Sequence, residues 1–244
     1  MGTSDLLDPV AALLTIQGAA GNNTLNISDA ADQSNNTGVL SATTLRGFGM
    51  NSGIDYFDIE TLNFTLGTGS DTLTVLSTHV RNTNINASTG DDSIWIQTSD
   101  GTTVINGDAG EDLVVTQATI AGVLNVFGGD DNDAFWISSN GPAANGVLPT
   151  ITGQLTFDGQ AGDDSLFADN AGDTNANDFL IETALLTFAG FGNANYVNLE
   201  TLTVNSGSNA DTITVATTHT GETNVNSNAG ADTVHVQTVA GATM

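Results

Sequence analysis

Eight nine-residue segments of this chain carry an aspartate, or once an asparagine, at their sixth position. The best preserved runs from Gly128 to Trp136 and begins with two glycines. The sixth-position residues, called here the Asp column, are Asn23, Asp71, Asp92, Asp112, Asp133, Asp164, Asp211 and Asp232. Carboxylates in irregular glycine turns are hard oxygen ligands, which suit Ca²⁺ better than Mg²⁺ because Mg²⁺ requires a tighter octahedron. The pattern therefore predicts calcium binding, and the alternative is that Asp and Gly are simply good turn formers.

The spacing of the Asp column indicates the architecture that must position it. Its members are 48, 21, 20, 21, 31, 47 and 21 residues apart, which is one repeated step with two doublings and one insertion. A period of about 20 to 50 residues is typical of stacked-repeat folds. We therefore expect residues 1–244 to form one elongated all-β domain. The expected fold is a parallel β-solenoid with about 21 residues per coil and roughly eleven coils.

Within each repeat, two short runs rich in β-branched residues flank the glycine turn and favour strands. Because side chains alternate along a strand, the second and fourth residues after the Asp column should face the core, as in Phe135 and Ile137. Glycines should supply the positive φ angles of tight turns. Two segments interrupt the rhythm, 46–58 and 138–149, and either is predicted to be an insertion that folds over a face of the stack.

A longer repeat is superimposed on the short one. Residues 14–103 recur at 155–243 with an offset of 140 or 141 positions. The second copy stops at Thr243, part-way through a coil, whereas solenoids ordinarily end in a polar cap. The sequence thus favours a chain that was cut from, or built to join, something longer.

The long repeat also duplicates a few polar residues that could be mistaken for a catalytic site. His79 recurs as His219 and Glu60 recurs as Glu200. Duplicated positions indicate structural roles more than a unique catalytic centre. We expect the two glutamates to cap a turn or to hydrogen-bond the backbone.

Composition excludes several classes of partner. The chain has 28 acidic residues against only Arg46 and Arg81, and its formal net charge is −26. Such a charge argues against binding nucleic acid or anionic lipid and favours cations. Cysteine is absent, so disulfides and thiolate metal sites are impossible. No apolar run approaches the roughly 20 residues that span a membrane. The first residues lack the basic region of a secretory signal, which is missing, removed or replaced by another export route.

The segment Gly128 to Trp136 resembles the nonapeptide G-G-x-G-x-D-x-U-x of the RTX, or haemolysin-type, calcium-binding proteins, with Asp131 in place of the third glycine. The resemblance implies a parallel β-roll in which Ca²⁺ lies between stacked turns on one edge. The implied ligands are Asp71, Asp92, Asp112, Asp133, Asp164, Asp211 and Asp232, with the carbonyls of Gly67, Gly107, Gly128 and Gly159. These segments are separated by 11 or 12 residues, whereas the family's nonapeptides run in tandem. The longer unit resembles repeat regions of large bacterial surface proteins.

A second column lies three residues after the first. Its central members are Trp95, Val115, Trp136 and Phe167. Alternation places these side chains outward, where isolated soluble domains rarely leave an apolar stripe exposed. The stripe predicts a lateral docking surface, and the alternative is that segment 138–149 or 46–58 covers it.

Together these patterns predict a structural and adhesive protein that works outside the cell or on its surface. Calcium would stiffen it, and copies would associate end to end or laterally. An ice-binding or glycan-binding solenoid is the alternative. A calcium-assisted polysaccharide lyase is a weaker one, because such chemistry needs a base and a cationic stabiliser and the chain has no lysine. The protein is therefore predicted not to be an enzyme.

Overall fold

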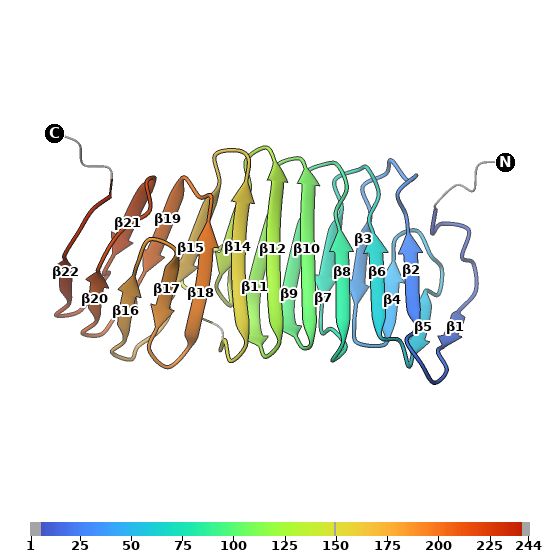
Figure 1. The fold of residues 1–244 in the computed structure, drawn as a ribbon, viewed down its shortest axis with the longest axis horizontal. Coiled ribbons are helices and arrows are strands. Elements are labelled where there is room, and N and C mark those ends of the chain that lie inside the picture. The colour runs from blue at the N-terminus through green and yellow to red at the C-terminus, as the bar shows by residue number, and fades with distance from the viewer. Residues whose placement is uncertain (1–5, 149, 241–244) are drawn as a thin grey trace.

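The computed structural model describes residues 6–148 and 150–240, apart from the side chain of Thr119, as two large β-sheets without helices (Figure 1). The all-β prediction is confirmed, and each sheet has eleven strands. The predicted end of the second repeat at Thr243 and the last residue of segment 138–149, Pro149, lie outside the described residues.

The first sheet, sheet A, lies behind the other in Figure 1. In spatial order it contains β1 (Leu14–Gln17), β5 (Ile54–Phe57), β4 (Thr44–Gly47), β3 (Thr37–Leu40), β7 (Thr72–Val75), β9 (Ser93–Ser99), β11 (Leu113–Ile120), β13 (Ala134–Ile137), β15 (Ser165–Asp169), β19 (Thr201–Asn205) and β21 (Glu222–Asn226).

The second sheet, sheet B, lies in front of sheet A in the same view. In spatial order it contains β2 (Thr24–Ser28), β6 (Thr61–Thr65), β8 (Asn82–Asn86), β10 (Thr102–Ala109), β12 (Val123–Asp130), β14 (Gln154–Gln160), β18 (Gly192–Val197), β17 (Leu185–Phe188), β16 (Asp178–Ile181), β20 (Thr212–Val215) and β22 (Thr233–Val236).

The chain alternates between the sheets from β6 to β15, and each strand from β6 to β13 pairs in parallel with the strand two elements later. The registers advance by about one short repeat, since Leu113 lies opposite Ser93 on one side and Ala134 on the other. This arrangement is solenoid-like. Turns that lead from sheet B to sheet A form the upper edge in Figure 1, and turns that lead from sheet A to sheet B form the lower edge.

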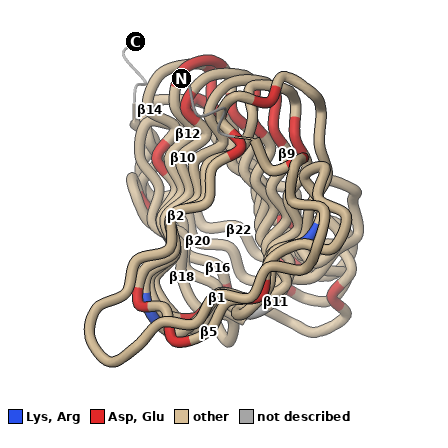
Figure 2. The backbone as a smooth tube through the Cα atoms, turned by 90° about the vertical axis from the view of Figure 1, so that its right-hand side faces the viewer, with Lys and Arg blue, Asp and Glu red and all other residues tan. Residues whose placement is uncertain are grey.

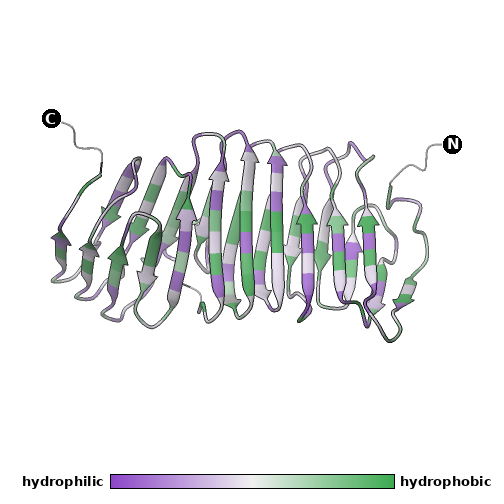
Figure 3. Ribbon diagram, in the orientation of Figure 1, coloured by the Kyte–Doolittle hydropathy of each residue, from purple (hydrophilic) through white to green (hydrophobic). Residues whose placement is uncertain are grey.

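A single apolar core runs between the sheets. Burial alternates along the strands, and Phe135 and Ile137 are fully buried as predicted. The striped colouring of Figure 3 shows the matching alternation of hydropathy. Phe135 packs against Phe157 of the facing sheet, with ring centroids 5.2 Å apart. The same pattern ends at β22, where Val234 and Val236 are 45% and 60% exposed.

Two strands run against the direction of their sheets. Strand β4 pairs antiparallel with β3 and β5, and β17 pairs antiparallel with β16 and β18. Nearly half of segment 46–58, residues 46–47 and 54–57, is therefore part of sheet A, whereas the sequence predicted an insertion over a face of the stack. Positive φ angles at Gly47, Phe48 and Gly49 turn the chain between β4 and β5. Periodicity alone could not reveal a reversal of direction.

The two copies of the long repeat occupy opposite sheets. Strands β1 and β2 correspond to β14 and β15, so equivalent elements are thirteen strands apart. Because each regular coil uses two strands, an odd offset moves every equivalent element to the other sheet. The second copy is thus related to the first by half a turn about the long axis of the stack.

Candidate functional site

Five aspartates of the Asp column line the inside of the upper edge. Each stands at the end of a turn and directly precedes a strand of sheet A. All five are nearly inaccessible to solvent, with exposed fractions of 1% to 4%, and they are Asp71, Asp92, Asp112, Asp133 and Asp164. Figure 2, viewed along the stack, shows acidic positions following one another along this edge.

Hydrogen bonds join these aspartates into a ladder along the stack. From Asp92 to Asp164, the Oδ1 atom of each one accepts the main-chain N–H of the column member in the preceding coil, and Oδ1 of Asp71 accepts that of Asn36. The N···O distances are 2.6 Å from Asp71 to Asp92, 2.8 Å from Asp92 to Asp112, 2.9 Å from Asp112 to Asp133 and 2.7 Å from Asp133 to Asp164. The ladder fastens successive turns together, because buried main-chain donors need such partners.

A glutamate extends the ladder beyond the Asp column on the upper edge, and its equivalent in the first copy makes the same kind of bond on the lower edge. The Oε2 atom of Glu200 accepts the N–H of Asp164 at 2.7 Å, and that of Glu60 accepts the N–H of Asn23 at 2.7 Å. The prediction that these duplicated glutamates hydrogen-bond the backbone is confirmed. The sequence did not predict that these glutamates bond to members of the Asp column, because both lie outside the nonapeptide pattern.

The second carboxyl oxygen of most rungs has no hydrogen-bond partner among the described residues. This applies to the buried Oδ2 atoms of Asp92, Asp112, Asp133 and Asp164, whereas Oδ2 of Asp71 accepts the N–H of Gly67 at 3.0 Å. A buried oxygen without a partner costs about 1–3 kcal/mol. Four such oxygens in one row therefore need a partner, which a proton, a bound cation or a buried water can supply.

The first glycine of the nonapeptide makes room for this second oxygen. A Cβ atom on Gly128 would stand 2.1 Å from Oδ2 of Asp133 and 2.7 Å from the carbonyl oxygen of Gly159 in the next coil. A Cβ atom on Gly159 would meet Oδ2 of Asp164 and the carbonyl of Asn198 in the same way. Carboxyl and carbonyl oxygens of neighbouring coils thus crowd together, and only glycine leaves both in place.

Asn23 is the one amide in the Asp column, and its hydrogen bonds show how a donor fits between the oxygens that crowd together in the other rungs. Asn23 is the equivalent of Asp164 in the first copy, and its Nδ2 donates to the carbonyl oxygens of Ala19 and Asp58. Asp58 is the equivalent of Asn198, whose carbonyl faces the carboxyl of Asp164. A donor in the Asn23 rung therefore stands where the Asp164 rung has a bare oxygen.

The buried carboxyls hold their protons more tightly than free aspartate does. Burial raises the pKa of Asp92 to about 8, and neighbouring carboxylates add to the effect. Burial likewise raises the pKa of Asp112 and of Asp133 to about 7, and it raises the pKa of Asp71 and of Asp164. Hydrogen bonds from the backbone oppose these shifts without cancelling them.

The sequence predicted that the whole Asp column lies on one edge of the stack. The structure places its members on both edges. Asp211 and Asp232 precede strands of sheet B and lie on the lower edge, where Oδ1 of Asp232 accepts the N–H of Asp211 at 3.0 Å. Five strands separate Asp164 from Asp211, whereas two separate column members that are 20 or 21 residues apart. The odd number transfers the column to the other side of the stack.

The carboxyl and carbonyl oxygens of the ladder are suited to binding calcium, but some of them already accept hydrogen bonds from the backbone. Calcium takes about six to eight oxygen ligands, and carboxylate and carbonyl oxygens are the kind it prefers. The carbonyls of Gly128 and Gly159 do lie beside the ladder, while every Oδ1 is used by the backbone. Within residues 6–148 and 150–240, no three acidic or histidine side chains gather as a metal-holding group. Calcium binding therefore stays a prediction.

The predicted apolar stripe is partly covered by the chain itself. Gly141, in segment 138–149, lies against Val115 and Trp136, and Val115 is fully buried. Trp136 also stacks on Phe167, with ring centroids 4.5 Å apart. The covering alternative thus holds for Val115 and Trp136, and Val115 is not available to a docking partner. Docking through Trp95 and Phe167, both half-buried, stays a prediction.

A scan against family models and searches of curated proteins and solved structures found no match for this chain. No helix able to cross a membrane occurs in the described part of the sequence. The function must therefore be argued from the geometry above.

Proposed function

We propose that this protein is an extracellular structural and adhesive element, a β-solenoid of roughly eleven coils with about 21 residues in each regular coil. The observation that carries the proposal is the ladder of buried carboxyls, which fastens coil to coil through a repeated hydrogen bond. A fold in which each coil contacts only its neighbours suits a rigid spacer.

In this proposal calcium neutralises the ladder once the chain has left the cell. The residues that would hold it are the unpartnered carboxyls of Asp92, Asp112, Asp133 and Asp164 with the neighbouring turn carbonyls. Calcium at millimolar concentration saturates weak sites of about 10⁻⁴ to 10⁻³ M outside cells. Bound calcium would replace the protons that the buried carboxyls otherwise retain, because metal ligands must be deprotonated.

Thermal unfolding at pH 8 with calcium, with magnesium and with chelator tests this role. We expect calcium to raise the melting temperature more than magnesium does. Asp112→Asn and Asp133→Asn should remove most of that gain, whereas Asp130→Asn, an exposed neighbour outside the ladder, should retain it. Equal melting of the wild-type chain in calcium and chelator would leave the aspartates with a turn-forming role alone.

End-to-end association of copies is the second part of the proposal. Val234 and Val236 of β22 are exposed, whereas Ile94 and Ile96 occupy the equivalent positions in β9 and are buried because β11 packs beside β9. The internal repeat therefore indicates what fits this face, which is another parallel coil of the same kind. We take the partner to be a second copy of this chain.

Sedimentation across a wide concentration range, together with electron microscopy, measures this association. Wild-type protein should form linear assemblies, and the paired substitution Val234→Thr and Val236→Thr should weaken them. Val147→Thr, at another exposed valine away from β22, is the matched control. A wild-type chain that sediments as a monomer at every concentration would rule out end-to-end association.

A further inference from the structure

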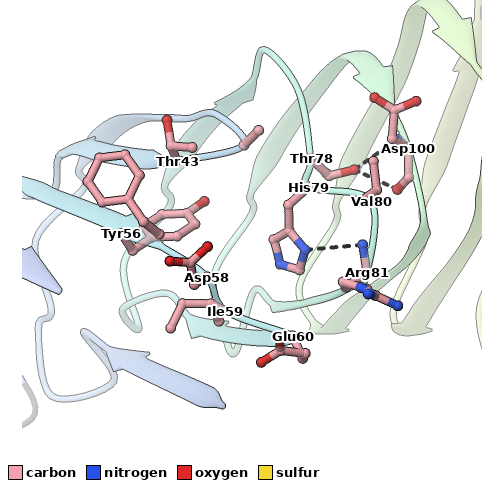
Figure 4. A pocket seen from close by; sticks show the side chains of 12 residues that line it. Thr43, Tyr56, Asp58, Ile59, Glu60, Thr78, His79, Val80, Arg81 and Asp100 are labelled. Carbon is pink, nitrogen blue, oxygen red and sulfur yellow. Dashed lines mark hydrogen bonds between the residues drawn. The ribbon is translucent and has the colours of Figure 1, made fainter. Parts of the chain in front are cut away.

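A groove on the lower edge lies apart from the carboxyl ladder. It has a volume of about 530 Å³ and is formed where the turns after β3, β5, β7 and β9 come together. Figure 4 shows His79 in the middle of this view, between the side that carries Tyr56 and Asp58 and the side that carries Arg81. Pockets of about 300–1,000 Å³ are the usual size for small-molecule sites.

Hydrogen bonds hold the floor of the groove in place, and one polar atom there has no partner among the described residues. The Nδ1 atom of His79 accepts the N–H of Arg81 at 3.2 Å, so in the neutral ring the proton is on Nε2, which is buried and has no partner. Burial lowers the pKa of His79 and favours that neutral ring. Beside it, Thr78 both donates to and accepts from the backbone of Asp100, at 2.8 and 2.9 Å.

The rim combines charged and apolar side chains. Asp58, Glu60, Arg81 and Asp100 are the charged residues that line the groove. Glu60 engages Asn23 through Oε2, and Asp58 accepts one bond from Gln17 through Oδ2, so each carboxylate keeps an oxygen for other donors. Phe57 and Val80 also line the groove and are 43% and 74% exposed.

The second copy of the long repeat shows which of these residues the fold itself requires. Tyr56, Glu60, Thr78 and His79 recur as Tyr196, Glu200, Thr218 and His219. Both tyrosine hydroxyls donate to a main-chain carbonyl, and both glutamates accept an N–H from the column. These four positions therefore build the turns in either copy.

Apart from Glu60, the rim residues do not recur. Phe57, Asp58, Val80, Arg81 and Asp100 are replaced by Val197, Asn198, Thr220, Gly221 and Ala240. The first copy thus carries an aromatic ring and opposite charges on a scaffold that the second copy builds without them. These five positions are free to serve a ligand.

We propose that this groove binds a neutral saccharide. Carboxylates and a guanidinium are suited to the paired hydroxyls of a sugar, and the apolar face of the ring can pack on Phe57 and Val80. Three carboxylates against one guanidinium disfavour acidic polysaccharides. The inference rests on the adhesive part of the proposed function and is independent of calcium binding and of end-to-end association.

Saturation-transfer NMR and calorimetry on the full chain, in chelator, provide the test. The probes are cello-, malto-, xylo- and manno-oligosaccharides, with oligogalacturonate as the acidic comparison. We expect at least one neutral probe to bind at millimolar concentration or better and oligogalacturonate not to bind. Phe57→Val and Arg81→Gln should each weaken binding about tenfold, since each removes one anchoring contact.

Matched variants separate binding from folding. Val80→Thr, which copies the residue of the second repeat, should also weaken binding, and Val197→Ala at the equivalent of Phe57 should not. The melting temperature of each variant shows whether it is folded. The proposal is overturned if no neutral probe binds, if only oligogalacturonate binds, if binding requires calcium, or if folded groove variants bind as well as the wild-type chain.

Discussion

The two copies of the long repeat build the same turn on opposite edges of the stack. In the first copy Glu60 accepts the N–H of an asparagine on the lower edge, and in the second Glu200 accepts the N–H of an aspartate on the upper edge. The hydrogen bond is 2.7 Å long in both. The turn geometry is therefore set by local sequence, while the identity of the buried side chain, amide or carboxyl, is free to differ.

The largest expected effect is on how the free energy of unfolding depends on pH. The carboxyl rungs titrate, whereas the amide rung at Asn23 does not. Below pH about 4 the buried carboxyls are protonated in both the folded and the unfolded chain. Between that pH and about 8 the folded chain binds more protons, because the pKa of Asp92 is raised to about 8 and those of Asp112 and Asp133 to about 7. The free energy of unfolding should therefore fall as pH rises, by on the order of several kcal/mol.

Denaturant unfolding in chelator at pH 5 and pH 8 measures this loss. Asp112→Asn should flatten the dependence, since an amide in that position does not titrate. A wild-type chain that is equally stable at both pH values would contradict the neutral-carboxyl interpretation of the ladder.

The next effect contrasts rungs whose first position is glycine with the rung that has alanine there. Gly128→Ala would place a methyl group 2.1 Å from Oδ2 of Asp133, so we expect a loss of about 1–3 kcal/mol, as in other overpacked cores. Ala87 occupies the same position before Asp92 and is buried. Ala87→Gly should therefore cost less, about 1 kcal/mol. The comparison fails if thermal unfolding ranks the two variants in the opposite order.

Exchanging the equivalent residues Asn23 and Asp164 should change the free energy of unfolding by a smaller amount. One of the two substitutions should stabilise the fold. Asp164→Asn supplies a donor towards the carbonyl of Asn198, so we expect a gain of about 1–2 kcal/mol at pH 8 in chelator. Asn23→Asp removes the donor that serves Ala19 and Asp58 and should lose a similar amount. Urea unfolding of both variants checks the pair, and a destabilised Asp164→Asn would show that the carboxyl itself is needed there.

The smallest effect should be the same in the two copies. Tyr56 donates to the carbonyl of Ser41 and Tyr196 to that of Glu182, and both rings are almost fully buried. Tyr56→Phe and Tyr196→Phe should each lower stability by about 1 kcal/mol, because a main-chain carbonyl loses its donor. Melting curves that separate the two variants widely would show that the copies do not share one turn.

Much of the fold could be predicted because strand alternation and turn chemistry are local properties. The sequence indicated that Phe135 and Ile137 face the core, and both are buried. It could not indicate which edge carries Asp211, since that depends on how many strands lie between column members. The reversed strands β4 and β17 contain ordinary strand residues, and nothing in a 21-residue period reports direction.

The candidate site was predictable in part for a similar reason. The column itself was visible as a spacing, and glycine at its first position was expected. The carboxyls turn inward and bond the neighbouring coil because the coils are stacked. The sequence of a single repeat gives no information about that stacking. Exposure of Val115 was predicted from alternation alone, but Gly141 lies over it, and only tertiary structure places that loop.

The half-turn between the two repeats has a mechanical consequence. A rod that carries the same features along one side bends, because repulsion and packing act unevenly across its section. Here each sheet contains one reversed strand and eleven strands in all, and the turns with Tyr56 and Tyr196 lie on opposite edges. Any curvature introduced by one copy is therefore opposed in direction by that of the other, so the two bends do not add up along the stack.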